Sequence, residues 1–397
     1  MPKRFYLHPL IALVVTALLP FHAAASSGKP VKVFILSGQS NMEGKASATT
    51  LEAVLNNPEH EHRGVIKHLK QDGQWVERDD VFVTYLDRKA TELSPSHGPL
   101  SVGFGSLMKL KDENGRWHNH PGVGPELGIG WVLGEHFDEP VLLIKAAWGG
   151  RSVNHTFRPP SAMPSEADLQ AHLERRKTKN PDATLGELRA SYGEDYRKVL
   201  SEVTRVLDDI DQYVPGYDEA AGFEIAGFVW FQGWNDMVSG GNPAYTEQLA
   251  HLIRDMRRDL HAPGLPFVIG ELGHKGVDAG GGYERFRRWQ RAVVAMDEFT
   301  GTVAYAETAK YWPTHLDTSE EYRAFGKLAG ANKRKPLDDP TRVDPAEFVR
   351  VNWTEKHAHI MPYRSDRPFH YMGSGLCYYR MGESMGRAMV GLIDGRD

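Results

Sequence analysis

Short apolar runs rich in β-branched residues recur along the chain and predict buried strands. Polar segments with helical periodicity separate several of them, including Tyr245–Leu260 and Tyr283–Phe299. This alternation of strands and helices predicts an α/β fold, with a central parallel sheet of about five strands and helices on both faces. The five predicted strands are Val31–Leu36, Val141–Ala147, Ala226–Gln232, Pro266–Gly270 and Val303–Glu307.

Three polar stretches interrupt this pattern and predict insertions near residues 45–120, 155–195 and 311–365. Within the first, Val81–Leu86 alternates like a strand, and Gly115–Trp117 is typical of a hairpin end. We therefore expect antiparallel strands there, forming one wall of a cleft. Apart from these insertions, residues 26–397 are predicted to form a single domain.

The first 25 residues have the pattern of a secretory signal. Lys3 and Arg4 precede the apolar run Leu10–Leu19, and Ala23–Ala25 supplies a small-residue cleavage site before Ser26. The apolar run is too short to span a bilayer. These features predict a cleaved signal peptide at residues 1–25, a secreted or periplasmic mature protein, and no stable membrane anchor.

Composition narrows the possible functions. The formal net charge is −5 and no basic tract occurs, so the chain lacks the electrostatic pattern of a nucleic-acid-binding protein. Cys377 is the single cysteine, which excludes an intramolecular disulfide, and its apolar neighbours predict a core position. His118 and His120 lack a second cluster of ligands nearby in the sequence and favour a surface loop over a zinc site.

Ser40 is the first candidate for chemistry. It follows the strand Val31–Leu36 and Gly38, where a helix can begin at Asn41. A serine on such a turn lies at the carboxyl edge of the sheet, near helix N–H groups that favour an oxyanion. Because Met42 replaces a glycine, the pattern is not the G-x-S-x-G elbow. An ordinary turn or helix-capping serine is the alternative interpretation.

Polar groups also follow later strands. Gly149 and Gly150 come after the second strand, and Gln232 to Asp236 after the third. Each segment alone is also typical of an ordinary βα turn, but glycine N–H groups and amide side chains are suitable oxyanion donors. His370 precedes the last predicted helix, and Asp366 lies four residues upstream, across Pro368.

Taken in order, these motifs resemble those of the SGNH (GDSL-like) hydrolases. Within that superfamily, the segments GQSNM, KAAWGG and WFQGWND are similar to the sialate O-acetylesterase-like branch, which includes carbohydrate esterase family 6 acetylxylan esterases. The resemblance extends from about Val31 to Ala388, without the insertions. It implies a flavodoxin-like, three-layer SGNH fold.

The resemblance also implies roles at the sheet edge. Ser40 matches the nucleophile, and its N–H together with Gly150 matches the oxyanion hole. Asn235 falls on the asparagine of G-x-N-D, whereas Gln232 matches the glutamine of W-x-Q-G-E. Either amide is therefore a candidate to complete the oxyanion hole. Trp234 replaces the glutamate of that motif.

His370 matches the general base of the family. The usual spacing is D-x-x-H, but Arg367 occupies the matching position and Asp366 lies one residue further away. The resemblance thus leaves open a Ser-His-Asp triad or a Ser-His dyad oriented by a backbone carbonyl. The remaining residues of the motifs, expected to contact substrate, are Gln39, Asn41 and Trp234.

The function implied is a secreted serine esterase that removes O-acetyl groups from carbohydrates, of the acetylxylan or sialate type, through an acyl-enzyme. No metal or organic cofactor is expected, and the partner is an acetylated carbohydrate. Two alternatives are a carbohydrate-binding member of the fold with little turnover, and a thioesterase or lipase of the same superfamily.

Overall fold

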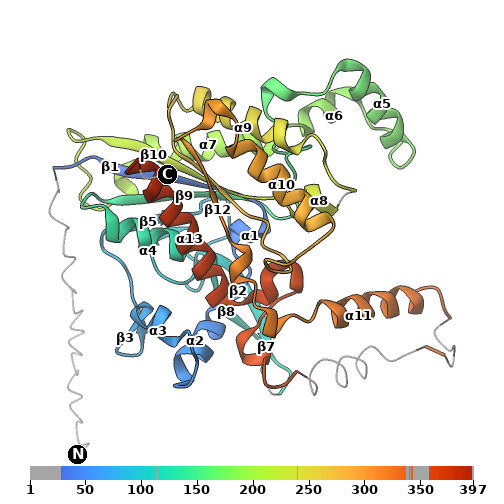
Figure 1. The fold of residues 1–397 in the computed structure, drawn as a ribbon, viewed down its shortest axis with the longest axis horizontal. Coiled ribbons are helices and arrows are strands. Elements are labelled where there is room, and N and C mark those ends of the chain that lie inside the picture. The colour runs from blue at the N-terminus through green and yellow to red at the C-terminus, as the bar shows by residue number, and fades with distance from the viewer. Residues whose placement is uncertain are drawn as a thin grey trace, which may run out of the picture.

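The computed structural model describes residues 28–112, 114–238, 240–336, 339, 341–342 and 357–395. The predicted signal peptide lies outside these residues. A seven-stranded sheet forms the centre of the molecule, in the order β12-β11-β10-β1-β9-β5-β6 (Figure 1). Its strands are β1 (Val31–Gly38), β5 (Val81–Thr84), β6 (His97–Pro99), β9 (Val141–Ala147), β10 (Phe223–Phe231), β11 (Phe267–Gly270) and β12 (Val303–Ala306).

The five predicted strands are confirmed, and they are contiguous in the sheet. They run parallel in the order β9-β1-β10-β11-β12. Numbered along the chain, this is the order 2-1-3-4-5 of flavodoxin-like folds. The chain thus has the expected α/β class and topology, in a sheet of seven strands rather than five.

The prediction for Val81–Leu86 is wrong. We expected this segment in an antiparallel insertion, but β5 pairs in parallel with β9 and extends the main sheet. All four residues of β5 are buried, as expected for a strand covered on both faces. Only β6, at the sheet edge, runs antiparallel to its neighbour.

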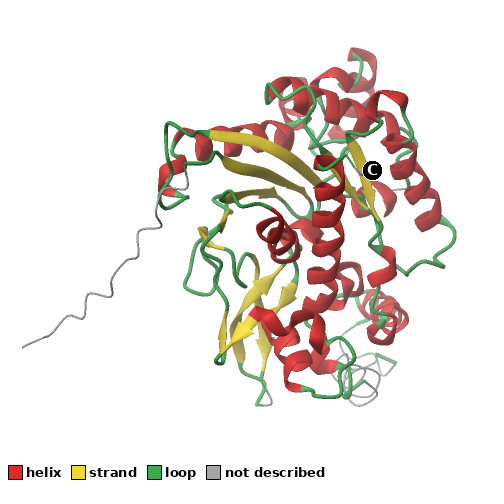
Figure 2. Ribbon diagram, turned by 60° about the vertical axis from the view of Figure 1, so that its left-hand side comes forward, coloured by secondary structure: helices red, strands yellow, loops and turns green. Residues whose placement is uncertain are grey.

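The predicted hairpin near Gly115 is present. Strands β7 (Gly105–Lys111) and β8 (Trp117–Val123) pair antiparallel, and β8 also pairs with β2 (Ala46–Ser47). This three-stranded sheet lies apart from the main sheet (Figure 2). A two-stranded ribbon of β3 (Lys70–Gln71) and β4 (Gln74–Trp75) completes the described strands.

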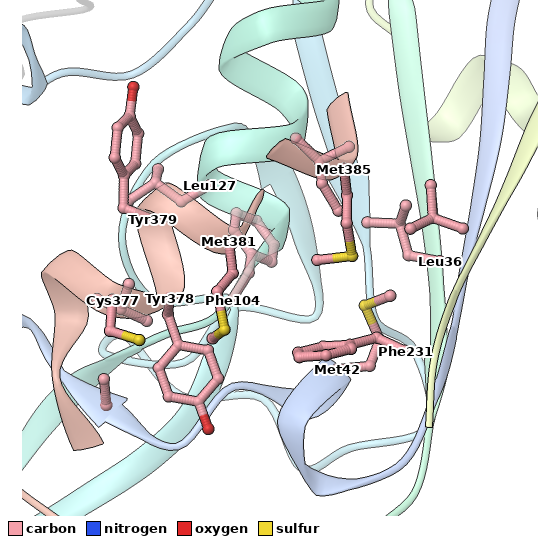
Figure 3. Packing of buried hydrophobic residues seen from close by; sticks show 14 of the residues in the cluster. Leu36, Met42, Phe104, Leu127, Phe231, Cys377, Tyr378, Tyr379, Met381 and Met385 are labelled. Atoms are coloured by element: carbon pink, nitrogen blue, oxygen red, sulfur yellow. The ribbon is translucent and has the colours of Figure 1, made fainter. Parts of the chain in front are cut away.

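Helices cover both faces of the main sheet. Alternate residues of β1 belong to two separate cores: Phe34 and Leu36 to one, Val33 and Ile35 to the other. The first core also contains residues of α4 and α13, and Figure 3 shows part of it. The second contains residues of α7, α9 and α10. These helices are α4 (Glu126–His136), α7 (Glu194–Asp208), α9 (Tyr245–Asp259), α10 (Gly282–Val294) and α13 (Gly375–Ile393).

Helices α4 and α13 approach each other closely because glycine lies at their contact. A Cβ on Gly128 would lie 2.1 Å from the Tyr379 carbonyl oxygen, so a larger residue would force the helices apart. Cys377 on α13 is buried and belongs to this core, as its sequence context predicted. Burial raises the pKa of its thiol.

The remaining α-helices are shorter or peripheral. Helices α6 (Leu185–Ser191) and α7 are separate, because Gly193 has a left-handed backbone conformation (φ +66°) between them. Among the described residues, no helix is both long and apolar enough to cross a membrane. The helices not yet named are α1 (Ser40–Glu43), α2 (Ala48–Asn56), α3 (Arg63–Ile66), α5 (Glu166–Lys177), α8 (Trp234–Val238) and α11 (Ser319–Asn332).

Candidate active site

The sequence candidates from the first three strand turns meet where the strand order reverses. In the sheet, β9 lies on one side of β1, and β10, the next strand of this sheet along the chain after β9, lies on the other side. The crevice outside the carboxyl ends at such a point is the usual ligand site of open α/β sheets. The turns after β1, β9 and β10 carry Ser40, Gly150 and Asn235.

Ser40 is the first residue of α1, directly after a turn that requires glycine. Gly38 has φ +148°, and a Cβ there would lie 2.2 Å from the Phe231 carbonyl oxygen on β10. The Ser40 side chain is largely buried. Within the described structure, the backbone N–H groups of Ser40 and Asn41 donate no hydrogen bond, as is usual at a helix start. These two donors are therefore available beside the serine hydroxyl.

The turn after β9 passes next to Ser40. The Gly149 N–H donates to Glu43 Oε1 at 3.0 Å, and a Cβ on Gly149 would lie 3.6 Å from Ser40 Cβ. Gly150 has a left-handed backbone conformation (φ +74°), and its N–H donates to no described group. Its carbonyl oxygen accepts a hydrogen bond from Asn235 Nδ2 at 2.9 Å. Gly150 thus contributes a third unpaired N–H near the serine.

Gln39 connects the end of β1 to the start of α8. Its Oε1 accepts hydrogen bonds from Gln232 Nε2 (3.2 Å) and from the N–H groups of Gly233 (3.2 Å) and Asn235 (3.3 Å). Its Nε2 donates to Asn235 Oδ1 at 3.1 Å. The side chain is 2% exposed, so its polar atoms are directed into the protein rather than toward a ligand.

The Gln232 side chain likewise forms its hydrogen bonds within the protein. Its Nε2 lies within hydrogen-bonding distance of Gln39 Oε1, the Arg151 carbonyl oxygen (3.1 Å) and Asp236 Oδ2 (2.7 Å). An amide nitrogen has two hydrogens, so these three acceptors leave none for a ligand. The side chain is 2% exposed. Asn235, in contrast, is half-buried, and one acceptor, the Gly150 carbonyl, engages its Nδ2.

Asp236 holds the loop that follows Gly150. Its carboxylate accepts hydrogen bonds from the N–H groups of Val153 (2.9 Å) and Asn154 (3.1 Å), as well as from Gln232. Burial raises the pKa of this carboxyl, and the hydrogen bonds to its charged form oppose that shift. Asp236 therefore links the turn after β10 to the turn after β9.

His370 and Asp366 form a hydrogen-bonded pair despite their unusual spacing. His370 Nδ1 lies 2.8 Å from Asp366 Oδ2, and Asp366 Oδ1 accepts the Arg367 N–H at 2.8 Å. Both residues lie in a segment that we call the His370 loop, residues 365–373. After His370, Tyr371 and Met372 have φ of +51° and +54°, a conformation rare for such residues and often found at functional sites.

Asn41 brings the His370 loop to the serine turn. Its Nδ2 lies 3.5 Å from the Phe369 carbonyl oxygen, so residues adjacent to Ser40 and to His370 are in contact. Its Oδ1 accepts a hydrogen bond from the Tyr378 hydroxyl at 2.8 Å. No hydrogen bond joins Ser40 to His370 in the described structure; such bonds often form only once substrate is bound.

Trp234 lies beside this loop, among other aromatic rings. Its ring centroid is 5.8 Å from that of Phe369, 6.4 Å from Tyr283 and 4.5 Å from His274. Trp234, Tyr283 and Phe369 are each half-buried. Together they form an aromatic wall next to the serine and histidine.

Two groups at the site were not predicted from the sequence. His274, in the turn after β11, is buried, and its Nε2 donates to the Phe369 carbonyl oxygen at 2.9 Å. Lys145, within β9, donates to the Glu43 carbonyl oxygen (2.8 Å) and forms a buried ion pair with Glu126 (2.6 Å). A lysine inside an apolar strand signals a buried partner, and His274 follows a strand that ends at the same sheet edge.

Burial dominates the electrostatics of both groups. Burial lowers the pKa of Lys145 to about 8, against the opposing effect of Glu126. It lowers the pKa of His274 to about 3. No group of three or more His, Cys, Asp or Glu side chains in the described residues is arranged to hold a metal ion.

A serine at a helix start, unpaired N–H groups beside it and a neighbouring histidine–carboxylate pair are typical of serine-dependent hydrolases. A protein-family model described as "Carbohydrate esterase, sialic acid-specific acetylesterase" matches residues 30–333. The chain therefore belongs to this family of carbohydrate esterases, as its motifs predicted. A search of curated proteins found no match.

Similar solved structures include three proteins of low sequence identity. XAC1771, a carbohydrate acetylesterase from Xanthomonas citri, is 14% identical, over 69% of this chain and 49% of that one, with a TM-score of 0.37. NanS is 12% identical, over 70% and 77%, with a TM-score of 0.36. A protein from Arabidopsis thaliana is 16% identical, over 70% and 86%, with a TM-score of 0.36. The chain spans about half the length of XAC1771.

Proposed function

We propose that this protein is a secreted carbohydrate O-acetylesterase that acts through an acetyl-enzyme on Ser40. The observation that carries the proposal is the His370–Asp366 pair, tied through Phe369 to the residue after Ser40, beside N–H groups without acceptors. Membership of the carbohydrate esterase family supports the acetylated carbohydrate as substrate. Export rests on the pattern of residues 1–25.

The proposed reaction has two halves. His370 Nε2 accepts the Ser40 hydroxyl proton while Oγ attacks the acetyl carbonyl carbon. The tetrahedral intermediate collapses as its C–O bond to the sugar breaks, and His370 gives its proton to the departing sugar oxygen. Water, deprotonated by His370, then attacks the acetyl carbonyl carbon; the bond to Ser40 Oγ breaks, His370 returns the proton to Oγ, and acetate leaves.

We assign the oxyanion hole to the N–H groups of Ser40 and Gly150 together with Asn235. The Nδ2 of Asn235 has one hydrogen on the Gly150 carbonyl and a second available, whereas both amide hydrogens of Gln232 are engaged within the protein. Gln232 is therefore proposed as a positioning residue. Each donor of this kind typically contributes about 10²–10³ in rate.

The structure alters the proposed roles of the other motif residues. Gln39 and Asn41 were expected to contact substrate, but both side chains are buried and hydrogen-bonded to protein groups. We propose that they position the turns around Ser40. Trp234 keeps its proposed role at the substrate, because the half-buried aromatic wall offers apolar surface to a sugar ring.

Asp366 is proposed as the third member of a triad. Its carboxylate is hydrogen-bonded to His370 Nδ1, which orients the ring with Nε2 free to accept a proton. This geometry favours the triad over a dyad oriented by a backbone carbonyl. The extra residue between Asp366 and His370 is accommodated by the turn at Pro368.

The test is acetate release by Ser40→Ala and by a matched control, Ser37→Ala. Ser37 is buried in β1, and its hydroxyl has no hydrogen-bond partner in the described structure. We expect the Ser40 variant to lose activity on acetylated xylan, acetylated sialic acid and aryl acetate, with an unchanged melting temperature, and the control to keep it. A Ser40 variant with full activity would refute the proposal.

Two further measurements separate the alternatives. A wild-type protein that binds acetylated glycans but releases no acetate would be a carbohydrate-binding member of the fold. A preference for longer acyl chains in a series of aryl esters would indicate a thioesterase or lipase. Mass spectrometry of the intact protein, quenched during turnover, is expected to detect an acetyl group on Ser40.

A further inference from the structure

The two residues on either side of His370, Phe369 and Tyr371, each form a hydrogen bond with one segment, the turn after β11. We call residues 271–276 the anchor loop. On one side of His370, the Phe369 carbonyl oxygen accepts a hydrogen bond from His274 Nε2 at 2.9 Å. On the other side, the Tyr371 hydroxyl accepts the Gly273 N–H at 3.0 Å. The anchor loop therefore holds both neighbours of His370, Phe369 by its backbone carbonyl and Tyr371 by its side-chain hydroxyl.

The anchor loop is itself fixed to α10. Arg287 is 1% exposed, and its guanidinium donates to the carbonyl oxygens of Leu272 (2.8 Å), His274 (2.7 Å) and Gly276 (2.8 Å). Three donated bonds from one planar group hold the loop in a single geometry. The anchor loop can thus act as a rigid support for the His370 loop.

The chemistry of His274 suits it to be a neutral donor. To donate to a carbonyl, Nε2 carries a hydrogen, and in the neutral ring Nδ1 is then unprotonated. Nδ1 is buried and has no partner in the described structure. The ring also lies against Trp234 (4.5 Å) and Tyr371 (4.4 Å), which leaves no acceptor for a second ring hydrogen. An imidazolium here would bury an unpaired N–H.

The His370 loop needs the support of these hydrogen bonds because its backbone is strained. Tyr371 and Met372 have positive φ angles, which are unfavourable for non-glycine residues and persist only where the surroundings impose them. The second bond to the Phe369 carbonyl, from Asn41 Nδ2, is long at 3.5 Å. His274 therefore provides the stronger of the two side-chain hydrogen bonds to the Phe369 carbonyl oxygen.

We propose that His274 is a positioning residue for the esterase reaction: through the Phe369 carbonyl it holds His370 at the angle needed to accept the Ser40 proton. The proposal rests on the proposed function of Ser40 and His370. His274 touches neither the substrate nor the reacting atoms in this role. Its contribution should therefore affect kcat much more than KM.

The experiment compares His274→Phe with His274→Gln. Phenylalanine keeps an aromatic ring but removes the donor, whereas glutamine places an amide N–H near the position of Nε2. For His274→Phe we expect kcat to fall about 30- to 100-fold, since small misplacements of reacting groups cost up to about 10². KM should change less than about threefold, and His274→Gln should recover most of the loss.

Two readouts separate positioning from a general structural effect. The downfield ¹H NMR signal of the His370 Nδ1 hydrogen, bonded to Asp366, should shift or broaden in His274→Phe and return in His274→Gln. The matched control is His68→Phe. His68 is an exposed histidine whose Nε2 lies 2.9 Å from the Tyr379 hydroxyl, in a groove between α4 and α13. It should leave both kcat and the NMR signal unchanged.

A folded His274→Phe variant with kcat within twofold of wild type would overturn the proposal, as would a His274→Gln variant no better than His274→Phe. If His274→Phe does not fold, Tyr371→Phe tests the second contact between the anchor loop and the His370 loop, because it removes the hydroxyl that accepts the Gly273 N–H. We expect the same selective loss of kcat, and an unchanged kcat would count against the proposal. Failure of the proposed function is a separate outcome, in which His370→Ala itself retains activity.

Discussion

Replacement of Asp366 by asparagine tests the proposed triad, because the structure dictates how the new amide would sit. Asp366 Oδ1 accepts the Arg367 N–H, whereas Oδ2 faces His370 Nδ1. In Asp366→Asn, the amide oxygen must stay on the Arg367 N–H, since an NH₂ group there would leave two donors facing each other. The NH₂ group then faces His370 Nδ1.

That orientation puts the hydrogen on the wrong nitrogen of His370. An NH₂ donor at Nδ1 favours the tautomer with the hydrogen on Nε2, which cannot accept the Ser40 proton. The variant also loses the carboxylate that stabilises the imidazolium. Losses of about 10⁴ in kcat are typical of this substitution in a triad, equivalent to about 5.4 kcal/mol of transition-state stabilisation. We expect a loss of about 10³–10⁴.

The assay is initial-rate hydrolysis of aryl acetate and of acetylated xylan, with folding checked by thermal melting. Asp366→Ala removes the carboxylate without imposing a tautomer, so it should be no worse than Asp366→Asn. The matched control is Asp80→Asn, which alters a carboxylate paired with Arg78 at 2.6 Å, next to the amino end of β5 and away from the proposed site. A loss below about tenfold in Asp366→Asn would refute the triad and favour a Ser-His dyad.

Four further outcomes follow from the site. Asn235→Ala should lower kcat by about 10²–10³ with little change in KM, measured with aryl acetate; an unchanged kcat would remove Asn235 from the oxyanion hole. Trp234→Ala should raise KM for acetylated xylo-oligosaccharides at least about fivefold, through lost ring contact, while hydrolysis of a small alkyl acetate, followed by acetate titration, stays near wild type. Burial lowers the pKa of His274 from 6.5 to about 3, so between these values the unfolded chain binds a proton that the folded protein does not. Stability should therefore fall as pH drops from about 6.5 toward 3, by up to about 1.4 kcal/mol per pH unit from this group, and urea unfolding of His274→Phe should lack that part of the pH dependence. Lys145→Met should destabilise the protein by about 3–5 kcal/mol, because it leaves the Glu126 carboxylate buried without its partner; urea unfolding of the double variant with Glu126→Leu should recover much of that loss.

The His370 loop also explains how an irregular motif can keep a usable geometry. The spacing of Asp366 and His370 differs from D-x-x-H by one residue, yet the two side chains lie 2.8 Å apart. The turn that begins at Pro368, between the two residues, accommodates the extra length. The number of intervening residues is therefore a weaker guide to this pair than the conformation of the loop.

Much of the fold could be predicted because its determinants are local. A parallel strand buried on both faces reads as a short apolar run, and five such runs identified β1, β9, β10, β11 and β12. Glycine turns at their carboxyl ends pointed to Ser40 and Gly150. The same reasoning misplaced Val81–Leu86. Parallel pairing with β9 places β5 in the main sheet, and the residues of β5 do not themselves specify β9 as the partner.

The residue types at the sheet edge could be predicted from local sequence, because strand pattern and turn chemistry are encoded within a few neighbouring positions. Which of these residues face a substrate depends on long-range contacts in the folded protein. Gln39 and Gln232 turn inward because their amides meet partners far away in sequence, and His274 reaches the Phe369 carbonyl across 95 positions. Such hydrogen bonds exist only once the loops after different strands converge, and this convergence is a property of the folded sheet rather than of any local segment.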